Sequence, residues 1–430
     1  MSKSGSSRRD FIKTTGAIAV GAAAMSTLGT NYAWAAGSDT IKVGMIGCGG
    51  RGTGAAHDAV AGAEKEKVGI EIIAMGDVFP DHMEKSRKQL EDIGDKMKVK
   101  DENVFIGFDA YKKVLAIPEI NYVILATPPG FRPLHLRAAV EAGKNVFMEK
   151  PVAVDPVGAR SVIESGEMAK QKNLAIVTGT QRRHDFGYNE TIKRIHEGAI
   201  GDVTGGACYW MQEALWMHPR KKEWSDTEWQ LRNWLYFTWL SGDHIVEQHV
   251  HNIDVINWVM GGPPISAYGM GGRQTRTDPA FGHIYDHFSI EYVYPNGQRV
   301  QSMCRQQEGT KARIGEHVVG TKGTSNCANT IEGSEKWKFE KKSDQLGPYQ
   351  QEHADLIASI RKGEPLNEAK RVAESTLTAI MGRTAAYTGQ LIKWEQMMKS
   401  ELSLMPKKLE MGPLPVAPVA MPGKEKFANT

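Results

Sequence analysis

The stretch IKVGMIGCGGRG, residues 41–52, decides the fold of this chain. Its apolar run at 41–46 predicts a buried strand, and a helix is expected after the glycines. Gly47 makes the tight turn, Gly49 lets the backbone approach a pyrophosphate, and Gly52 allows the helix to pack closely on the strand. Asp77 ends the next strand, where a carboxylate can accept hydrogen bonds from ribose hydroxyls. The stretch therefore predicts a Rossmann domain that binds a dinucleotide.

Further apolar strands alternate with helices after this motif, at residues 70–75, 122–126, 145–148 and 174–178. This alternation predicts a parallel, doubly wound sheet, and we assign residues 40–179 to it. Beyond residue 179, period-2 runs at 265–271, 287–294, 298–305 and 316–320 favour a mainly antiparallel sheet with helices beside it. We assign residues 180–395 to this second α/β domain and the proline-rich residues 396–430 to an extended arm.

The N-terminus has the three parts of a cleavable twin-arginine export signal. Arg8 and Arg9 stand in SRRDFIK, an apolar run follows at 17–25, and Ala33-Trp34-Ala35 is a small-residue cleavage site. The apolar run is too short to span a bilayer. We therefore expect residues 1–35 to be removed by the export pathway and the mature protein to be periplasmic or secreted. The twin-arginine machinery is then a partner, and its substrates fold, often with a cofactor, before export.

Charge and cysteine content exclude other classes of protein. The net charge of +3 belongs to the leader, and the rest of the chain is balanced without a basic cluster, which argues against nucleic acid as a partner. The four cysteines lack the spacing of a zinc site. Because folding before export takes place in a reducing compartment, we expect free thiols.

Four short motifs follow the glycine loop in order: Ala126-Thr127-Pro128, Ala142-Gly143-Lys144, Glu149-Lys150-Pro151 and GTKGT at 320–324. With them, residues 41–394 resemble the glucose–fructose oxidoreductase / inositol dehydrogenase (Gfo/Idh/MocA) family. The resemblance implies a Rossmann domain joined to an α/β domain with an open, mainly antiparallel sheet. That sheet often forms an oligomer interface, so a homo-oligomer, a dimer or tetramer, is expected.

The glycine loop and the resemblance together give the cofactor site. Asp77 would repel a 2′-phosphate and favours NAD, while Arg51 leaves NADP possible. The predicted cofactor-binding residues are Gly47, Gly49, Gly50, Arg51, Gly52, Asp77, Thr127, Pro128, Glu149 and Lys150.

The resemblance also implies the catalytic residues Lys150, His251 and Glu247. In the family, the lysine of Glu-Lys-Pro bonds the hydroxyl being oxidised, and a histidine in the pattern Asp-x-x-x-His accepts its proton. His251 matches that histidine, whereas Glu247 replaces the aspartate. Four positions apart on a helix, Glu247 and His251 share a face, so we expect the carboxylate to orient the imidazole. A family histidine that follows Thr-Pro is Arg132 here.

Four ligand-type side chains fall within eight residues: His244, Glu247, His249 and His251. A metal site is conceivable, but we favour a hydrogen-bonded proton relay and predict no metal. Tryptophans upstream are interleaved with basic residues and favour a carbohydrate-facing wall, although most of them are expected in the core. The predicted substrate-binding residues are Gln181, Arg183, Trp234, Asp243 and His249.

These patterns predict an exported NAD(P)-dependent oxidoreductase acting on a hydroxyl of a sugar, polyol or glycoside. Outside the cytoplasm no NAD pool replaces a lost cofactor, which favours one that stays bound and is recycled in place. Two alternatives remain open. One is a redox-neutral glycosidase that oxidises, eliminates and then restores its NAD. The other is a non-catalytic sugar-binding protein, against which Lys150 and His251 argue.

Overall fold

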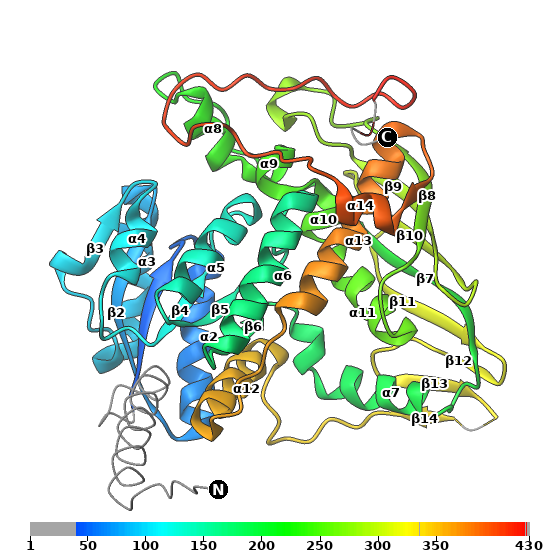
Figure 1. Cartoon of the computed structure of the whole chain (residues 1–430), viewed down its shortest axis with the longest axis horizontal. Coiled ribbons are helices and arrows are strands. Elements are labelled where there is room, and N and C mark those ends of the chain that lie inside the picture. Colours follow the sequence, from blue (N-terminus) through cyan, green and yellow to red (C-terminus); the bar gives the residue numbers. More distant parts are fainter. Residues whose placement is uncertain (1–39, 335, 426, 428–430) are drawn as a thin grey trace, which may run out of the picture.

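The computed structural model describes residues 40–334, 336–425 and 427 of the 430-residue chain. The predicted leader, residues 1–35, lies outside these residues. Two sheets organise the chain, one at the left and one at the right of Figure 1. Within the described ranges, no helix has both the length and the apolar character needed to cross a membrane.

The first sheet confirms the predicted Rossmann fold. Its six strands are parallel, in the order β3-β2-β1-β4-β5-β6. The order reverses between β1 and β4, which is the switch point where such sheets bind ligands at their carboxyl ends. The strands are β1 Thr40–Ile46, β2 Gly69–Asp77, β3 Val104–Ile106, β4 Tyr122–Leu125, β5 Asn145–Met148 and β6 Ile176–Thr178. The helices are α2 Gly50–Glu66, α3 Pro80–Gln89, α4 Ala110–Leu115, α5 Arg132–Glu141 and α6 Pro156–Gln171.

The second sheet is mixed and mainly antiparallel, as predicted. Its nine strands run in the order β14-β13-β12-β11-β7-β10-β9-β8-β15, and only β7 and β10 pair in parallel. They are β7 Val203–Gln212, β8 Ser266–Gly272, β9 His287–Val293, β10 Arg299–Gln306, β11 Arg313–Gly320, β12 Gly323–Ser325, β13 Thr330–Gly333, β14 Trp337–Lys338 and β15 Ile392–Lys393.

The remaining helices follow β6 in the chain. They are α7 Phe186–His196, α8 Asp226–Arg232, α9 Thr238–Ser241, α10 His244–Glu247, α11 Val250–Met260, α12 Pro348–Lys362, α13 Ala369–Thr388 and α14 Trp394–Lys399. Short 3₁₀ turns occur in both domains: η1 Leu90–Lys96, η2 Asp101–Asn103, η3 Pro129–Phe131, η4 Gln181–His184, η5 Trp234–Tyr236 and η6 Pro279–Phe281.

One of these helices, α12, packs on the first domain. Its buried Leu356 and Ile357 share a hydrophobic core with strand β1 and helix α2. The two helices approach so closely at Gly62 that a Cβ there would lie 2.8 Å from the backbone nitrogen of Ala354. The Rossmann core is therefore completed by a helix far outside residues 40–179, which strand and helix periodicity does not reveal.

An aromatic core joins the two domains above the carboxyl ends of the first sheet. It packs Phe79 and Phe131 of the first domain against buried Trp229 and Trp239 of the second. Residues 404–414 of the extended arm cover this core, and Figure 1 shows the arm in red passing over α8 and α9. Two tryptophans of the rich stretch, Trp229 and Trp239, are therefore buried in this core.

Candidate active site

A large cleft lies between the domains at the carboxyl ends of β1, β2, β4 and β5. Its volume is about 1110 Å³, and its walls include the glycine loop, Asp77, Lys150 and His251. Residues 216–234 of the second domain form part of the opposite wall. The cleft therefore brings the predicted cofactor loop and the predicted catalytic side chains into one cavity.

The glycine loop has the geometry that a pyrophosphate needs. Gly47 has a φ of +95°, and its N–H donates to the carbonyl of Gly76 at 2.8 Å. A Cβ at Gly52 would overlap the carbonyl of Gly47, so the third glycine is needed for packing. Gly49 and Gly50, at the N-terminus of α2, face open space, and no side chain caps the helix. The unpaired N–H groups of this helix end are a site for phosphate.

Asp77 lines the cleft at the end of β2 and is anchored by backbone donors. Its carboxylate accepts from the N–H of Cys48 at 2.7 Å and from the N–H of Phe79 at 2.9 Å. Cys48 belongs to the glycine loop, so this carboxylate also fixes the loop against β2. The three other cysteines, like Cys48, are buried free thiols.

Arg51 of the glycine loop is enclosed by carboxylates. It forms ion pairs with Glu149, with Asp58 at 3.0 Å and with Glu352 at 3.5 Å, and its guanidinium lies 4.9 Å from the ring of Tyr349. Burial, followed by the charge of Glu149, raises the pKa of Glu352 well above its usual value. Tyr349 and Glu352 belong to α12, so this helix also supports the cofactor loop; no local pattern pointed to it.

Lys150 follows β5 and extends into the cleft beside Glu247. Its Nζ donates to the backbone carbonyl of Glu247 at 2.6 Å and to the carboxylate Oε1 at 2.9 Å. The ammonium group has three N–H donors, and these two contacts leave one for a ligand in the cleft. Glu247 thus positions Lys150.

His251 lines the same cleft, but Glu247 does not orient it as predicted. Its Nδ1 is buried without a hydrogen-bond partner, and its ring stacks on Trp210 at 5.7 Å. The chain bends between α10 and α11, so Glu247 and His251 stand on different helices. Burial, assisted by the charge of Lys150, lowers the pKa of His251 well below its usual value. The imidazole is therefore neutral, as a proton acceptor must be.

Thr127 and Pro128 form the edge of the cleft after β4. The buried Arg132 holds this edge in place, since it donates to the carbonyls of Thr127 and of Glu149, the latter at 2.9 Å. His135 contacts the Thr127 hydroxyl at 3.1 Å, and burial with the nearby Arg132 lowers its pKa to about 3. All five residues line the cleft.

Of the predicted substrate-binding residues, only Trp234 lines the cleft, beside Trp216 and Trp224. Asp243 is fully buried and caps α10. Its carboxylate accepts from the N–H groups of His244 and Tyr285 and from the hydroxyl of Tyr387. His249 is also fully buried and contacts Ser302 at 2.8 Å. Gln181 contacts the cleft only through the hydroxyl of Tyr349, at 3.2 Å.

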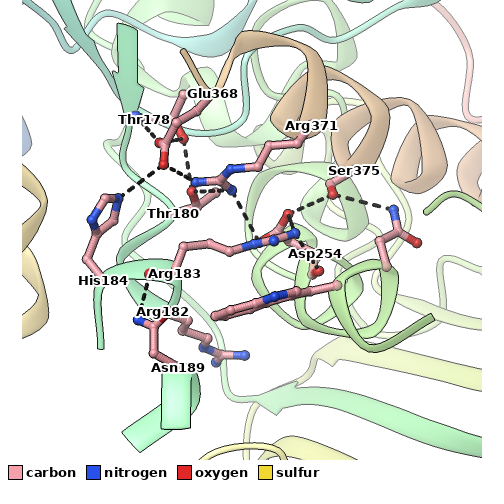
Figure 2. A network of polar contacts seen from close by, with 12 residues as sticks. Thr178, Thr180, Arg182, Arg183, His184, Asn189, Asp254, Glu368, Arg371 and Ser375 are labelled. Carbon is pink, nitrogen blue, oxygen red and sulfur yellow. Dashed lines mark hydrogen bonds and ion pairs between the residues drawn. The ribbon is translucent and has the colours of Figure 1, made fainter. Parts of the chain in front are cut away.

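Arg183 likewise lies outside the cleft, in a buried polar network at the junction of the domains (Figure 2). It forms two hydrogen bonds to the carboxylate of Asp254, at 2.8 and 3.0 Å, and Ser375 donates to the same carboxylate at 2.7 Å. Its guanidinium lies 4.5 Å from the ring of Trp258. Asp254 stands one turn after His251 in α11, so this network fixes the helix that carries the candidate base.

The predicted proton relay does not form. His244 pairs with Asp243, His249 with Ser302 and Glu247 with Lys150, while His251 faces the cleft. In the part of the chain that the structure describes, no three His, Cys, Asp or Glu side chains converge as a metal site requires.

Comparison with known proteins agrees with this geometry. Residues 41–179 match the model of the oxidoreductase family with an NAD-binding Rossmann fold, and residues 188–326 match the GFO/IDH/MocA C-terminal domain. The chain belongs to the Gfo/Idh/MocA family. Its cofactor is NAD, bound by the Rossmann domain, and the open Gly49 and the uncapped end of α2 fit that group.

Relatives within the Gfo/Idh/MocA family include several enzymes of sugar and polyol metabolism. The chain is 26% identical to inositol 2-dehydrogenase 3 of Saccharopolyspora erythraea over 66% of this chain and 72% of that one. It is 25% identical to a glycosyl hydrolase family 109 protein of Streptomyces coelicolor over 69% and 60%. The chain spans only about half the length of some other curated relatives, 50% for the 2,7-anhydro-N-acetylneuraminate hydratase of Escherichia coli.

Among solved structures, the fold matches scyllo-inositol dehydrogenase from Lactobacillus casei, determined with NAD(H) and scyllo-inositol. The TM-score is 0.60 at 20% identity, covering 82% of this chain and 99% of that one. The whole two-domain architecture, and not only the Rossmann half, is therefore that of this family.

Proposed function

We propose that this protein is an exported NAD-dependent oxidoreductase that oxidises a secondary hydroxyl of a sugar, polyol or glycoside and keeps its cofactor bound. One observation carries the proposal. Lys150 and His251 line the same cleft as the open glycine loop, with one side chain a charged donor and the other a neutral acceptor. That pairing is what removal of a hydroxyl proton requires.

The roles of the two side chains follow from their contacts. Lys150, fixed by Glu247, donates its remaining N–H to the oxygen of the reacting hydroxyl, and His251 takes the hydroxyl proton. Bound NAD supplies the acceptor for the carbinol hydride. The alcohol thus loses a hydride and a proton and becomes a carbonyl. Burial of His251 disfavours its protonated form. The imidazole therefore releases the proton again and is neutral for the next turnover.

Selection of NAD over NADP is supported by charge at the adenosine end. Asp77 places a carboxylate where a 2′-phosphate would lie. Arg51, the predicted counter-ion for that phosphate, is already paired with three carboxylates. We expect the purified protein to contain NAD(H), identified by mass spectrometry after denaturation, and NADP instead would refute this selection.

Catalysis is tested with the exported protein by following the absorbance of bound nicotinamide near 340 nm on addition of sugars, polyols and glycosides. Lys150→Met should abolish the change, while binding of the cofactor persists. Lys172→Met is a matched control, because the Lys172 ammonium also makes two hydrogen bonds, to the carbonyls of Val140 and Glu141, but lies outside the cleft. Unchanged activity in Lys150→Met would refute the proposed role.

A redox-neutral glycosidase is a second candidate, favoured by the family 109 relative and by a retained cofactor. The same protein mixed with nitrophenyl glycosides distinguishes the two reactions. Release of nitrophenol without lasting reduction supports the glycosidase, whereas lasting reduction without release supports the dehydrogenase.

Export is supported by the order of the leader features. The proposed retention of the cofactor depends on export, because a cofactor lost outside the cytoplasm is not replaced there. Replacing Arg8 and Arg9 together by lysine should leave the protein in the cytoplasmic fraction with its leader uncleaved. Lys13→Arg is the control. Periplasmic protein in equal amount from the double variant would refute the twin-arginine route.

A further inference from the structure

One end of the cofactor cleft is crossed by an ion pair between the two domains. Asp77 marks this as the adenosine end, since the carboxylate that ends β2 binds the ribose. The helix that follows, α3, contributes Asp81, His82 and Lys85 to the wall. The facing wall comes from the second domain and includes Trp224 and Arg232.

Arg232 connects these walls through three kinds of contact. Its guanidinium binds the carboxylate of Asp81 through two nitrogens, at 2.9 and 3.2 Å, although the residues are 151 positions apart. It lies 4.0 Å from the ring of Phe79 and 5.0 Å from that of Trp224. Glu228, one turn earlier in α8, accepts from its Nε at 2.9 Å and holds the side chain in place. A planar, bidentate pair between aromatic rings is a favourable setting for arginine.

The helix that carries Arg232, α8, is held by hydrogen bonds to the C-terminal arm. Gln230 donates to the carbonyl of Leu414 at 2.7 Å, and the N–H of Thr227 donates to that of Gly412 at 3.1 Å. The aromatic core beneath contains Phe79 itself together with Trp229 and residues of the arm. The contact between Arg232 and Asp81 therefore joins two firmly supported surfaces, and Asp81, with a side chain 60% exposed, is its more accessible partner.

We propose that Arg232, Asp81 and Phe79 form a clasp across the adenosine end of the cleft that limits the rate at which NAD leaves. A bound dinucleotide can depart along this side only after the Arg232–Asp81 pair opens. The inference rests on the cofactor retention proposed above and adds the residues responsible. It concerns release alone and is independent of the substrate.

The test measures dissociation of NADH from the full-length exported protein. NADH fluorescence is followed after mixing the loaded protein with a large excess of unlabelled NAD. Arg232→Gln and Asp81→Asn should each release NADH at least tenfold faster than the wild type. Arg220→Gln is the matched control, because Arg220 pairs with Asp226 in the same segment and lies 4.9 Å from Trp229 but does not line the cleft.

Asp81→Asn keeps the test valid if Arg232→Gln destabilises the segment, since Asp81 is largely exposed. Added salt should also speed release from the wild type but not from Asp81→Asn, because salt screens a partly exposed ion pair. Release from both variants at the wild-type rate would overturn the clasp. Release from the wild type within about a second would overturn retention, while faster release from the variants would still support the clasp.

Discussion

Replacing Arg183 by methionine tests whether the buried network at the domain junction holds the catalytic helix. The substitution keeps much of the apolar stem beside Trp258 and removes the two hydrogen bonds to the carboxylate of Asp254, with a third to its backbone carbonyl. Asp254 is 1% exposed, so its charge would remain buried with only Ser375 and the more distant Arg371, 4.0 Å away. Removing one partner of a buried ion pair lowers the free energy of unfolding by about 3–5 kcal/mol. Because Ser375 and Arg371 still contact Asp254, we expect a loss at the lower end, about 3 kcal/mol.

A loss of about 3 kcal/mol corresponds to a fall in Tm of about 6 °C for a domain of this size. Thermal unfolding followed by circular dichroism measures it. Arg194→Met is the matched control, since Arg194 also lies over a tryptophan ring and pairs with a carboxylate, but at the surface, and should change the stability by less than about 0.5 kcal/mol. Asp254→Asn alone should also destabilise, while the double variant should lose clearly less than the two single losses combined.

Acid strengthens the same test. Burial raises the pKa of Asp254, but the charge and hydrogen bonds of Arg183 outweigh it, so the pKa lies below its usual value. The stability from this ionised carboxylate is present above the unfolded pKa, near 4, and is lost as the pH falls through the folded value. In Arg183→Met the folded pKa moves back toward or above the unfolded value, so the variant should lose less stability in acid and its deficit relative to the wild type should narrow as the pH falls. Additive single losses together with an unchanged acid profile would refute the reasoning.

Three further predictions concern two residues of the site and His184 in the buried network of Figure 2. Gly49→Val should fill the open space beside α2 and weaken NAD binding at least tenfold, measured by calorimetry, with little change in Tm. Glu247→Gln should lower kcat in the 340 nm assay and change KM much less, because Lys150 loses its charged partner. A changed KM with an unchanged kcat would contradict a positioning role. Burial lowers the pKa of His184, but Glu368 and Asp355 raise it to about 9. Its stabilisation should therefore be complete below about pH 6.5 and disappear as the pH rises through 9, and His184→Gln should flatten that slope in urea unfolding.

The fold was predictable because its signals are local. The strand, glycine turn and helix at 41–66 and the period-2 strands of the second sheet each follow from adjacent residues. The completion of the Rossmann core by α12 was not predictable, because Leu356 and Ile357 look like any apolar helix face until their partners are known.

The site was predictable where a motif fixes the backbone. Lys150 and His251 line one cleft, but the orientation of His251 by Glu247 failed because it assumed one continuous helix, and the structure has two. Asp243 and His249 form hydrogen bonds with other buried polar groups. The sequence alone does not distinguish that structural role from substrate binding. The pair of Asp81 with Arg232 depends on a contact across the two domains that no spacing rule encodes.

The packing of α12 on α2 has a consequence for the order in which this protein is made. Domains generally fold from the N-terminus as the chain leaves the ribosome. Here the part of the β1 and α2 core that Leu356, Ile357 and Ile360 cover stays exposed until residues 348–362 have been synthesised. The core of the first domain is therefore completed late in synthesis, and a nascent chain interrupted earlier exposes that surface to chaperones. Chains that end before α12 would thus reach the proposed export route, which admits only folded proteins, with this core incomplete.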